Sequence, residues 1–228
     1  MCSSKAGALA LLILGLACQA APPALEQPLE ERWVVCVSSV RLPSWKPWIS
    51  RFAHHSWIDV KQGNRFAWTR IEVWERGGVR MREIGEDWAC AEERWDRPVH
   101  GHALWLGEEA RVLGERLLAV APEVGARYEQ GYQAWPGPNS NTFVAEVMRA
   151  VDGLELELDH NAVGKDYAMP IGLSWMGERT GVALDTPLFG LGVGVLEGLE
   201  LHALQLHLGL SLFPPALELP FAPRLGWR

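Results

Sequence analysis

The segment from Trp135 to Val144 constrains the fold more than any other part of this sequence. Its two prolines exclude a helix and keep the backbone extended, and the glycine between them fits where a side chain would not. Apolar residues then recur at helical spacing from Phe143 to Val151, which predicts an amphipathic helix. The polar run Asn139–Thr142 is therefore expected at or just before the helix N-terminus. There, such side chains either cap the helix or present a nucleophile.

The N-terminus is typical of an exported protein. A basic start is followed by an apolar run, Ala8–Ala17, that is too short to span a bilayer, and small residues follow it. We predict a leader over residues 1–20, a Pro- and Glu-rich tether over residues 21–31 and one domain over residues 32–228. Cleavage gives a periplasmic or secreted protein. Alternatively, Cys18 is the lipidated first residue of a membrane-anchored lipoprotein, although the lipobox before it is imperfect.

Composition narrows the class of partner. The 228 residues are 48% hydrophobic and 21% charged, enough for one sizeable core. A formal charge of −7 argues against nucleic acid, and membrane contact is expected only through an anchor at Cys18. Twelve tryptophans indicate a tryptophan-rich core; the alternative is an apolar groove for glycans or acyl chains. A small-molecule, lipid or cell-wall ligand remains as the expected partner.

The cysteines predict no metal site, because there is no Cys-x-x-Cys and no nearby histidine pair in register. No cofactor is predicted either. Removal of the leader leaves Cys36 and Cys90, which either form a disulfide in an oxidising compartment or remain as two buried thiols. The sequence leaves both alternatives open.

The alternation of strand patterns and turns predicts an α+β domain with an antiparallel sheet and a few helices. Gly77-Gly78 is the strongest hairpin signal. Expected strands are residues 32–40, 55–61, 65–76 and 79–84, with Gly-interrupted strands from residue 181 onward; expected helices are residues 107–121, ended by Pro122, and 143 to about 152; residues 87–102 are expected to be irregular, and residues 161–166 to be a loop with a surface Lys165–Asp166 ion pair.

Four residues form the candidate catalytic site. Ser140 is the nucleophile at its helix start and His55 is its general base. Glu72 on the next strand orients the imidazole, and Asn139 with nearby amides holds an oxyanion. The simpler alternative is that the polar run only caps the helix and that His55 is a packed residue. Other candidates are Asp59 behind Glu72, and His54, His100 and His102 as alternative bases.

Three motifs resemble an uncharacterised bacterial family, number 3750 among the domains of unknown function. They are Trp-Pro-Gly-Pro-Asn-Ser-Asn-Thr-Phe from Trp135, His-Ser-Trp-Ile-Asp-Val-Lys from His55, and Gly-Lys-Asp from Gly164. The resemblance extends over residues 32–226, including Pro-Ala-Leu-Glu-Leu-Pro from Pro215. It implies no established function.

A looser resemblance is to the circularly permuted papain-like fold of lecithin-retinol acyltransferase-like enzymes and cell-wall peptidase relatives. There, a strand histidine precedes Asn-Cys-x-x-Phe-Val at a helix start. His55 and the segment Asn139–Val144 match this order, but Ser140 stands in place of the cysteine. A serine hydroxyl does not ionise like a cysteine thiol. Either Ser140 is a nucleophile activated by a base, or the scaffold has lost catalysis and binds a ligand.

We therefore expect an exported envelope protein that is a Ser/His hydrolase or acyltransferase acting on an amide or ester. The alternative is a non-catalytic envelope lipoprotein or binding domain on a degenerate papain-like scaffold. A solvent-reachable cleft in which Ser140 and His55 meet would distinguish the two.

Overall fold

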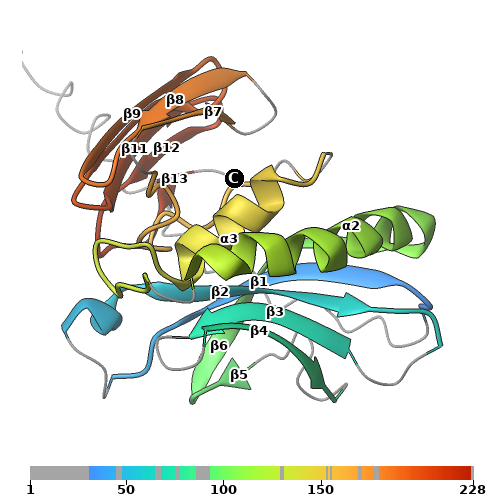
Figure 1. Cartoon of the computed structure of the whole chain (residues 1–228). Coiled ribbons are helices and arrows are strands. Elements are labelled where there is room, and N and C mark those ends of the chain that lie inside the picture. Colours follow the sequence, from blue (N-terminus) through green and yellow to red (C-terminus); the bar gives the residue numbers. More distant parts are fainter. Residues whose placement is uncertain are drawn as a thin grey trace, which may run out of the picture.

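A computed structural model describes residues 31–44, 48–64, 68–74, 78–85, 93–128, 131–152, 154, 156–168, 171–176 and 180–226. These residues form an α+β protein with two antiparallel sheets. Figure 1 shows helices α2 and α3 on one face of the first sheet, with the second sheet on the far side of α3. The predicted leader, tether and Cys18 lie outside the described residues.

The elements follow the chain in a simple order. They are β1 (Val34–Arg41), η1 (Trp48–Arg51), β2 (His54–Lys61), β3 (Trp68–Trp74), β4 (Gly78–Ile84), β5 (Glu93–Arg94), β6 (Arg97–Leu106), α2 (Gly107–Gly125), η3 (Ala126–Tyr128), α3 (Ser140–Arg149), β7 (Gly172–Met176), β8 (Gly181–Asp185), β9 (Phe189–Gly194), β10 (Gly198–Ala203), β11 (Leu206–Leu212), β12 (Pro215–Glu218) and β13 (Leu225–Gly226).

The first sheet has the strand order β4-β3-β2-β1-β6-β5. The expected strands are confirmed, and β3 and β4 form the antiparallel pair that the Gly-Gly signal predicted. The expectation that residues 87–102 are irregular is wrong for their second half, because β6 begins at Arg97 and pairs with β1. Its proline, glycine and histidines hide the strand pattern, but an internal partner strand supplies the hydrogen bonds.

The main core lies between the first sheet and the two helices. Residues at alternate positions of the strands, such as Ile58 and Val60, pack against apolar residues of α2 and α3, including Leu117 and Phe143. Helix α2 approaches closely at Gly114, where an added Cβ would lie 2.9 Å from a methyl of Val60. The helix layer is therefore fixed against one particular face of β2.

Helix α2 does not end at Pro122 as predicted but continues to Gly125. A proline removes one backbone hydrogen bond and crowds the preceding turn. Here Ala121 and Val124 on either side of it are buried in the core. Their burial offsets the lost bond, so the helix ends only at the next glycine.

The second sheet has the order β13-β12-β11-β10-β9-β8-β7. Its glycines lie within strands, as the interrupted apolar pattern predicted. The sheet face toward the body of the protein carries polar residues such as Asp185 and His202, which are buried. The opposite face carries exposed leucines and valines. No helix in the described part of the chain is long and apolar enough to cross a membrane.

Cys36 in β1 is disulfide-bonded, so it is not one of two free buried thiols. The predicted partner, Cys90, lies outside the described residues. The predicted tryptophan-rich core is found only in part, because Trp57 and Trp68 are fully buried whereas Trp48, Trp135 and Trp175 are exposed.

Candidate functional site

Helix α3 begins with a dense polar cap. The Asn139 side chain accepts hydrogen bonds from the backbone amides of Asn141, at 2.9 Å, and Thr142, at 3.3 Å. Thr142 accepts in return from the Asn139 amide, which completes a capping box. The predicted helix start is confirmed, and Asn139 is its N-cap.

The amide group of Asn139 also donates to the carbonyls of Ala134, at 3.1 Å, and Val163, at 3.0 Å. Both of its hydrogens are therefore committed, and its oxygen is taken by the cap. The geometry does not support Asn139 as a donor to an oxyanion. Its contacts instead join the segment before α3, the first turn of α3 and the loop that contains Val163.

Asn141 ties the helix to β2. Its side-chain oxygen accepts from the Ser56 amide at 3.0 Å, and its amide donates to the carbonyls of His54, at 2.8 Å, and Val163, at 2.9 Å. Thr142 donates to the Gly164 carbonyl at 2.7 Å. Gly164 has φ +93°, and an added Cβ would lie 2.4 Å from the Asn139 side chain, so glycine is required here.

Ser140 differs from its three polar neighbours. Its hydroxyl has no hydrogen-bond partner among the described residues, yet it is not sealed from solvent. Its backbone amide is also the first-turn amide that Asn139 does not take. A helix N-terminus adds positive potential at this point. Within the polar run, only Ser140 is left uncommitted.

The structure does not bring His55 to Ser140. Successive residues of a strand point to opposite faces. Ile58 and Val60 define the face of β2 that packs on α3, and the backbone amide of Ser56 donates to the Asn141 side chain. His55 therefore points to the other side of the sheet. The predicted nucleophile–base pair is absent from this structure because its members lie on opposite faces.

His55 does contact Glu72, as the predicted pairing of their strands implied. Its Nε2 lies 2.9 Å from a Glu72 carboxylate oxygen, and both side chains are buried. Arg94 lies 3.4 Å from the same oxygen and stacks over three tryptophan rings, including Trp57 at 5.0 Å. Burial opposes ionisation of Glu72, but His55 and Arg94 outweigh it and lower the pKa of that carboxyl. This cluster is a sealed structural network.

Asp59, the reserve candidate for orienting His55, belongs to the same face of the sheet. It accepts two hydrogen bonds from Arg70, at 2.7 and 2.8 Å, and one from the Trp57 indole at 3.0 Å. All three side chains are buried. Asp59 is therefore committed to a buried ion pair away from α3.

His54, one residue earlier, lies on the α3 side. Its carbonyl accepts from Asn141, and its amide donates to the Asn161 carbonyl at 2.9 Å. Its Nδ1 lies 3.5 Å from an Asp159 oxygen, and its ring stacks on His100 at 5.3 Å between centroids. Burial lowers the pKa of His54 to about 4, so the imidazole is neutral at pH 7.

Asp159 was missed from the sequence. Burial favours its neutral form, but the neighbouring imidazoles of His54 and His160 outweigh this effect and lower its pKa to about 2. The Asn161 amide donates to its carboxylate at 2.7 Å. His102, another alternative base, contacts the Ser39 hydroxyl at 2.8 Å. The only sequence signal for Asp159 was its place before the predicted loop at residues 161–166.

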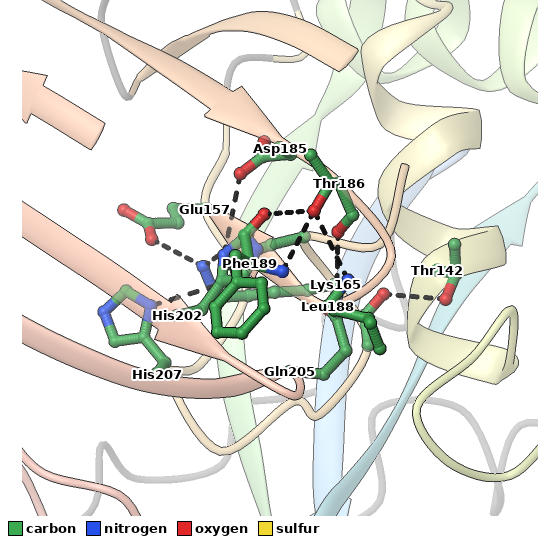
Figure 2. Close-up of polar contacts among 12 residues, drawn as sticks. Thr142, Glu157, Lys165, Asp185, Thr186, Leu188, Phe189, His202, Gln205 and His207 are labelled. Carbon is green, nitrogen blue, oxygen red and sulfur yellow. Dashed lines mark hydrogen bonds and ion pairs between the residues drawn. The ribbon is translucent and has the colours of Figure 1, made fainter. Parts of the chain in front are cut away.

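The predicted surface ion pair of Lys165 and Asp166 is wrong in its location, because Lys165 is buried. Figure 2 shows the Lys165 side chain directed toward the second sheet, where its ammonium bonds Glu157 and Asp166, each at 2.9 Å. His207 lies 3.8 Å from Asp166 and 3.1 Å from Glu218. Burial and Lys165 lower its pKa, but these carboxylates raise it to about 9 overall.

A cavity of about 320 Å³ lies between α3 and β7 beside this cluster. Its lining combines apolar residues such as Met148 and Trp175 with an excess of carboxylates. Burial, and then a neighbouring carboxylate, raise the pKa of Asp185 to about 6 and that of Glu200 to about 7. The described residues contain no group of His, Cys, Asp and Glu that would hold a metal ion.

Fold and site together define an α+β protein with a helix layer between two antiparallel sheets and a polar clasp at the start of α3. The chain belongs to the family described as protein of unknown function (DUF3750), which matches residues 36–167. That range ends just after the loop at residues 161–166, so it contains Ser140, His54 and Asp159 but not the second sheet. No curated protein and no solved structure matches the chain. The resemblance to the papain-like fold is therefore not supported by any similar solved structure.

Proposed function

We propose that the chain is an exported serine hydrolase or acyltransferase in which His54, rather than His55, is the base for Ser140. The observation that supports this most is the contrast at the start of α3. Asn139, Asn141 and Thr142 are all consumed by hydrogen bonds, whereas the Ser140 hydroxyl is uncommitted.

His54 has the properties that a base requires. It lies on the face of β2 that meets α3, and Asn141 bonds its carbonyl directly. With its pKa lowered to about 4 by burial, the ring is unprotonated at neutral pH, although it is a weaker base than an ordinary imidazole. The Asp159 carboxylate lies 3.5 Å from Nδ1 without a hydrogen bond, and its charge stabilises the imidazolium. Ser140 and His54 are not hydrogen-bonded here, and such bonds often form only when substrate is present.

The reaction follows from these positions. The Ser140 oxygen attacks the carbonyl carbon of an ester or amide while its proton passes to His54. The tetrahedral oxyanion is held by the Ser140 amide and the N-terminal potential of α3, in place of the Asn139 side chain. His54 then protonates the leaving group, and water or an acceptor alcohol or amine releases the acyl group.

Location and substrate class are part of the same proposal. The leader over residues 1–20 directs export, with release into the periplasm or anchoring through Cys18. The substrate is then an ester or amide of the cell wall or of a lipid. The resemblance of Asn139–Val144 to the papain-like helix start supports a site at this position, and His54 takes the place predicted for His55.

The test is labelling of the purified chain with a fluorophosphonate, located by peptide mass spectrometry. We expect the label on Ser140, its loss in Ser140→Ala and at least a tenfold slower rate in His54→Gln. Ser174→Ala, on the second sheet, is the matched control and should label normally. Circular dichroism checks that each variant is folded. A folded wild-type chain that takes no label, or His54→Gln labelling at the wild-type rate, would refute the proposal.

The cavity beside Lys165 supports a second candidate, a non-catalytic binding domain. A partly apolar cavity with more carboxylates than cations in its lining suits a small amphipathic amine. Burial, and then the nearby carboxylates of Asp166 and Glu157, raise the pKa of Asp185 and Glu200, and a bound cation would favour their charged forms. Hexylamine should raise the melting temperature at pH 8, and Glu200→Gln should abolish the shift. Butanol serves as the uncharged control. A wild-type shift equal with both probes would refute cation recognition.

A further inference from the structure

The outer face of the second sheet is apolar across five consecutive strands. One row of directly paired residues runs through Leu173, Leu184, Leu191, Leu201 and Leu208. Each of these leucines is between 40% and 76% exposed. They occupy alternate positions, so the polar residues of the same strands point inward.

A second row lies beside the first. It runs through Trp175, Val182, Val193, Leu199 and Leu210, each again paired directly with the next. Their exposed fractions lie between 45% and 64%. Neither row contains a charged side chain. We call these ten residues the outer apolar face.

The area of this face is too large for an ordinary solvated surface. Ten large side chains that are about half exposed present roughly 1,000 Å². The largest apolar patch on a typical monomer covers about 300–600 Å². A standard interface, in contrast, buries about 800 Å² on each partner. The outer apolar face therefore has the size of a complete protein interface.

We propose that a second copy of this chain covers the outer apolar face, so that two such sheets pack face to face as a symmetric β-sandwich. Sheets pack at about 10 Å through interdigitating apolar side chains, and two-fold symmetry requires only a self-complementary patch. About 1,000 Å² from each copy is in the range of stable homodimers.

The charge around this sheet favours a second copy over a lipid surface. Among the described residues from 171 to 226, the charged side chains other than histidine are four acids and one base: Asp185, Glu197, Glu200, Glu218 and Arg224. Membrane-binding faces are usually flanked by lysine and arginine, which attract anionic lipids. Asp185, Glu200 and Glu218 point to the inner face of this sheet, and the one base in its described part, Arg224, pairs with Glu218, so no basic rim attracts anionic lipids to the outer apolar face. The proposal is independent of the catalytic one, because Ser140 lies on the other side of the sheet.

The test is sedimentation equilibrium of the purified chain, with flotation on phosphatidylcholine vesicles in parallel. We expect twice the 25.4 kDa mass of one chain and no flotation. Leu201→Glu and, independently, Leu208→Glu place a charge in the middle of the face and should raise the dimer dissociation constant at least 100-fold. Met81→Glu, at an exposed apolar residue of β4, is the matched control and should leave the dimer intact.

Circular dichroism establishes that the variants are folded, which is expected because both leucines are already exposed. A folded wild-type chain that sediments as a monomer at 10 μM would overturn the proposal. So would flotation of that monomer on the vesicles, which would assign the face to lipid instead. A dimer unaffected by both glutamate variants would place the interface elsewhere and equally contradict the inference.

Discussion

Substitutions at Asn139 should separate the stability contributed by the helix cap from that contributed by the two side-chain bonds to Ala134 and Val163. Asn139→Ala removes a cap worth about 1 kcal/mol and two donated hydrogen bonds worth about 1 kcal/mol each. The free energy of unfolding should fall by roughly 3 kcal/mol. Asn139→Ser keeps a capping oxygen but loses the two bonds to Ala134 and Val163, so it should cost about 2 kcal/mol. Asn139→Asp keeps the cap but turns a carboxylate toward those carbonyls, and should cost at least as much as alanine.

Urea denaturation at pH 7, followed by tryptophan fluorescence, measures these differences provided that the m-value is unchanged. Ser44→Ala, at an exposed residue, serves as a remote control and should stay within about 0.5 kcal/mol of wild type. If Asn139→Ala costs less than about 1 kcal/mol, the contacts to Ala134 and Val163 do not stabilise the fold. If the serine and alanine variants are equally unstable, the cap contributes nothing.

Three further predictions concern titration, backbone geometry and a buried ion pair. The pKa of His54 in the folded protein, about 4, lies below its unfolded value of 6.5. The free energy of unfolding should therefore fall by roughly 3 kcal/mol as the pH drops from about 6.5 to 4. Urea titrations should show a smaller fall in His54→Gln. Gly164→Ala should lower the melting temperature by at least about 5 °C in calorimetry, because it adds both the positive-φ strain and the clash with Asn139; an unchanged temperature would contradict the close approach of these two segments. Arg70→Met leaves buried Asp59 without its two-bond partner and should cost about 3–5 kcal/mol in urea, whereas adding Asp59→Asn should recover part of that loss.

The start of α3 could be predicted from sequence because its signals are local. The prolines forbid helix before Asn139, and the apolar spacing demands helix after it. The positions of most strands could also be predicted from sequence, because the alternation of apolar and polar residues and the Gly-Gly hairpin signal act over a few residues. Strand β6 was missed because pairing with β1 stabilises it from a distance, and its own composition gives little sign of this.

The choice between His54 and His55 could not be made from the strand alone. Adjacent residues face opposite sides, and both sides of β2 are buried. One signal was present: His54 shares its side with Ile58 and Val60, the side without Asp59 and Lys61, and an amphipathic helix would cover that uncharged side. The burial of Lys165 had no such signal, because it depends on a second sheet packing over the loop.

The arrangement of the clasp goes beyond what a helix cap requires. Asn139 alone provides the capping oxygen, yet Asn141 and Thr142 add bonds to β2 and to the loop at Val163 and Gly164. Together these bonds fix the backbone on both sides of Ser140 while leaving its hydroxyl uncommitted. A nucleophile gains from such preorganisation, since its position is set by neighbours and its own bonding capacity is kept for substrate. A purely structural role predicts the reverse, with the hydroxyl bonded like those of its neighbours, and on this contrast the catalytic proposal stands.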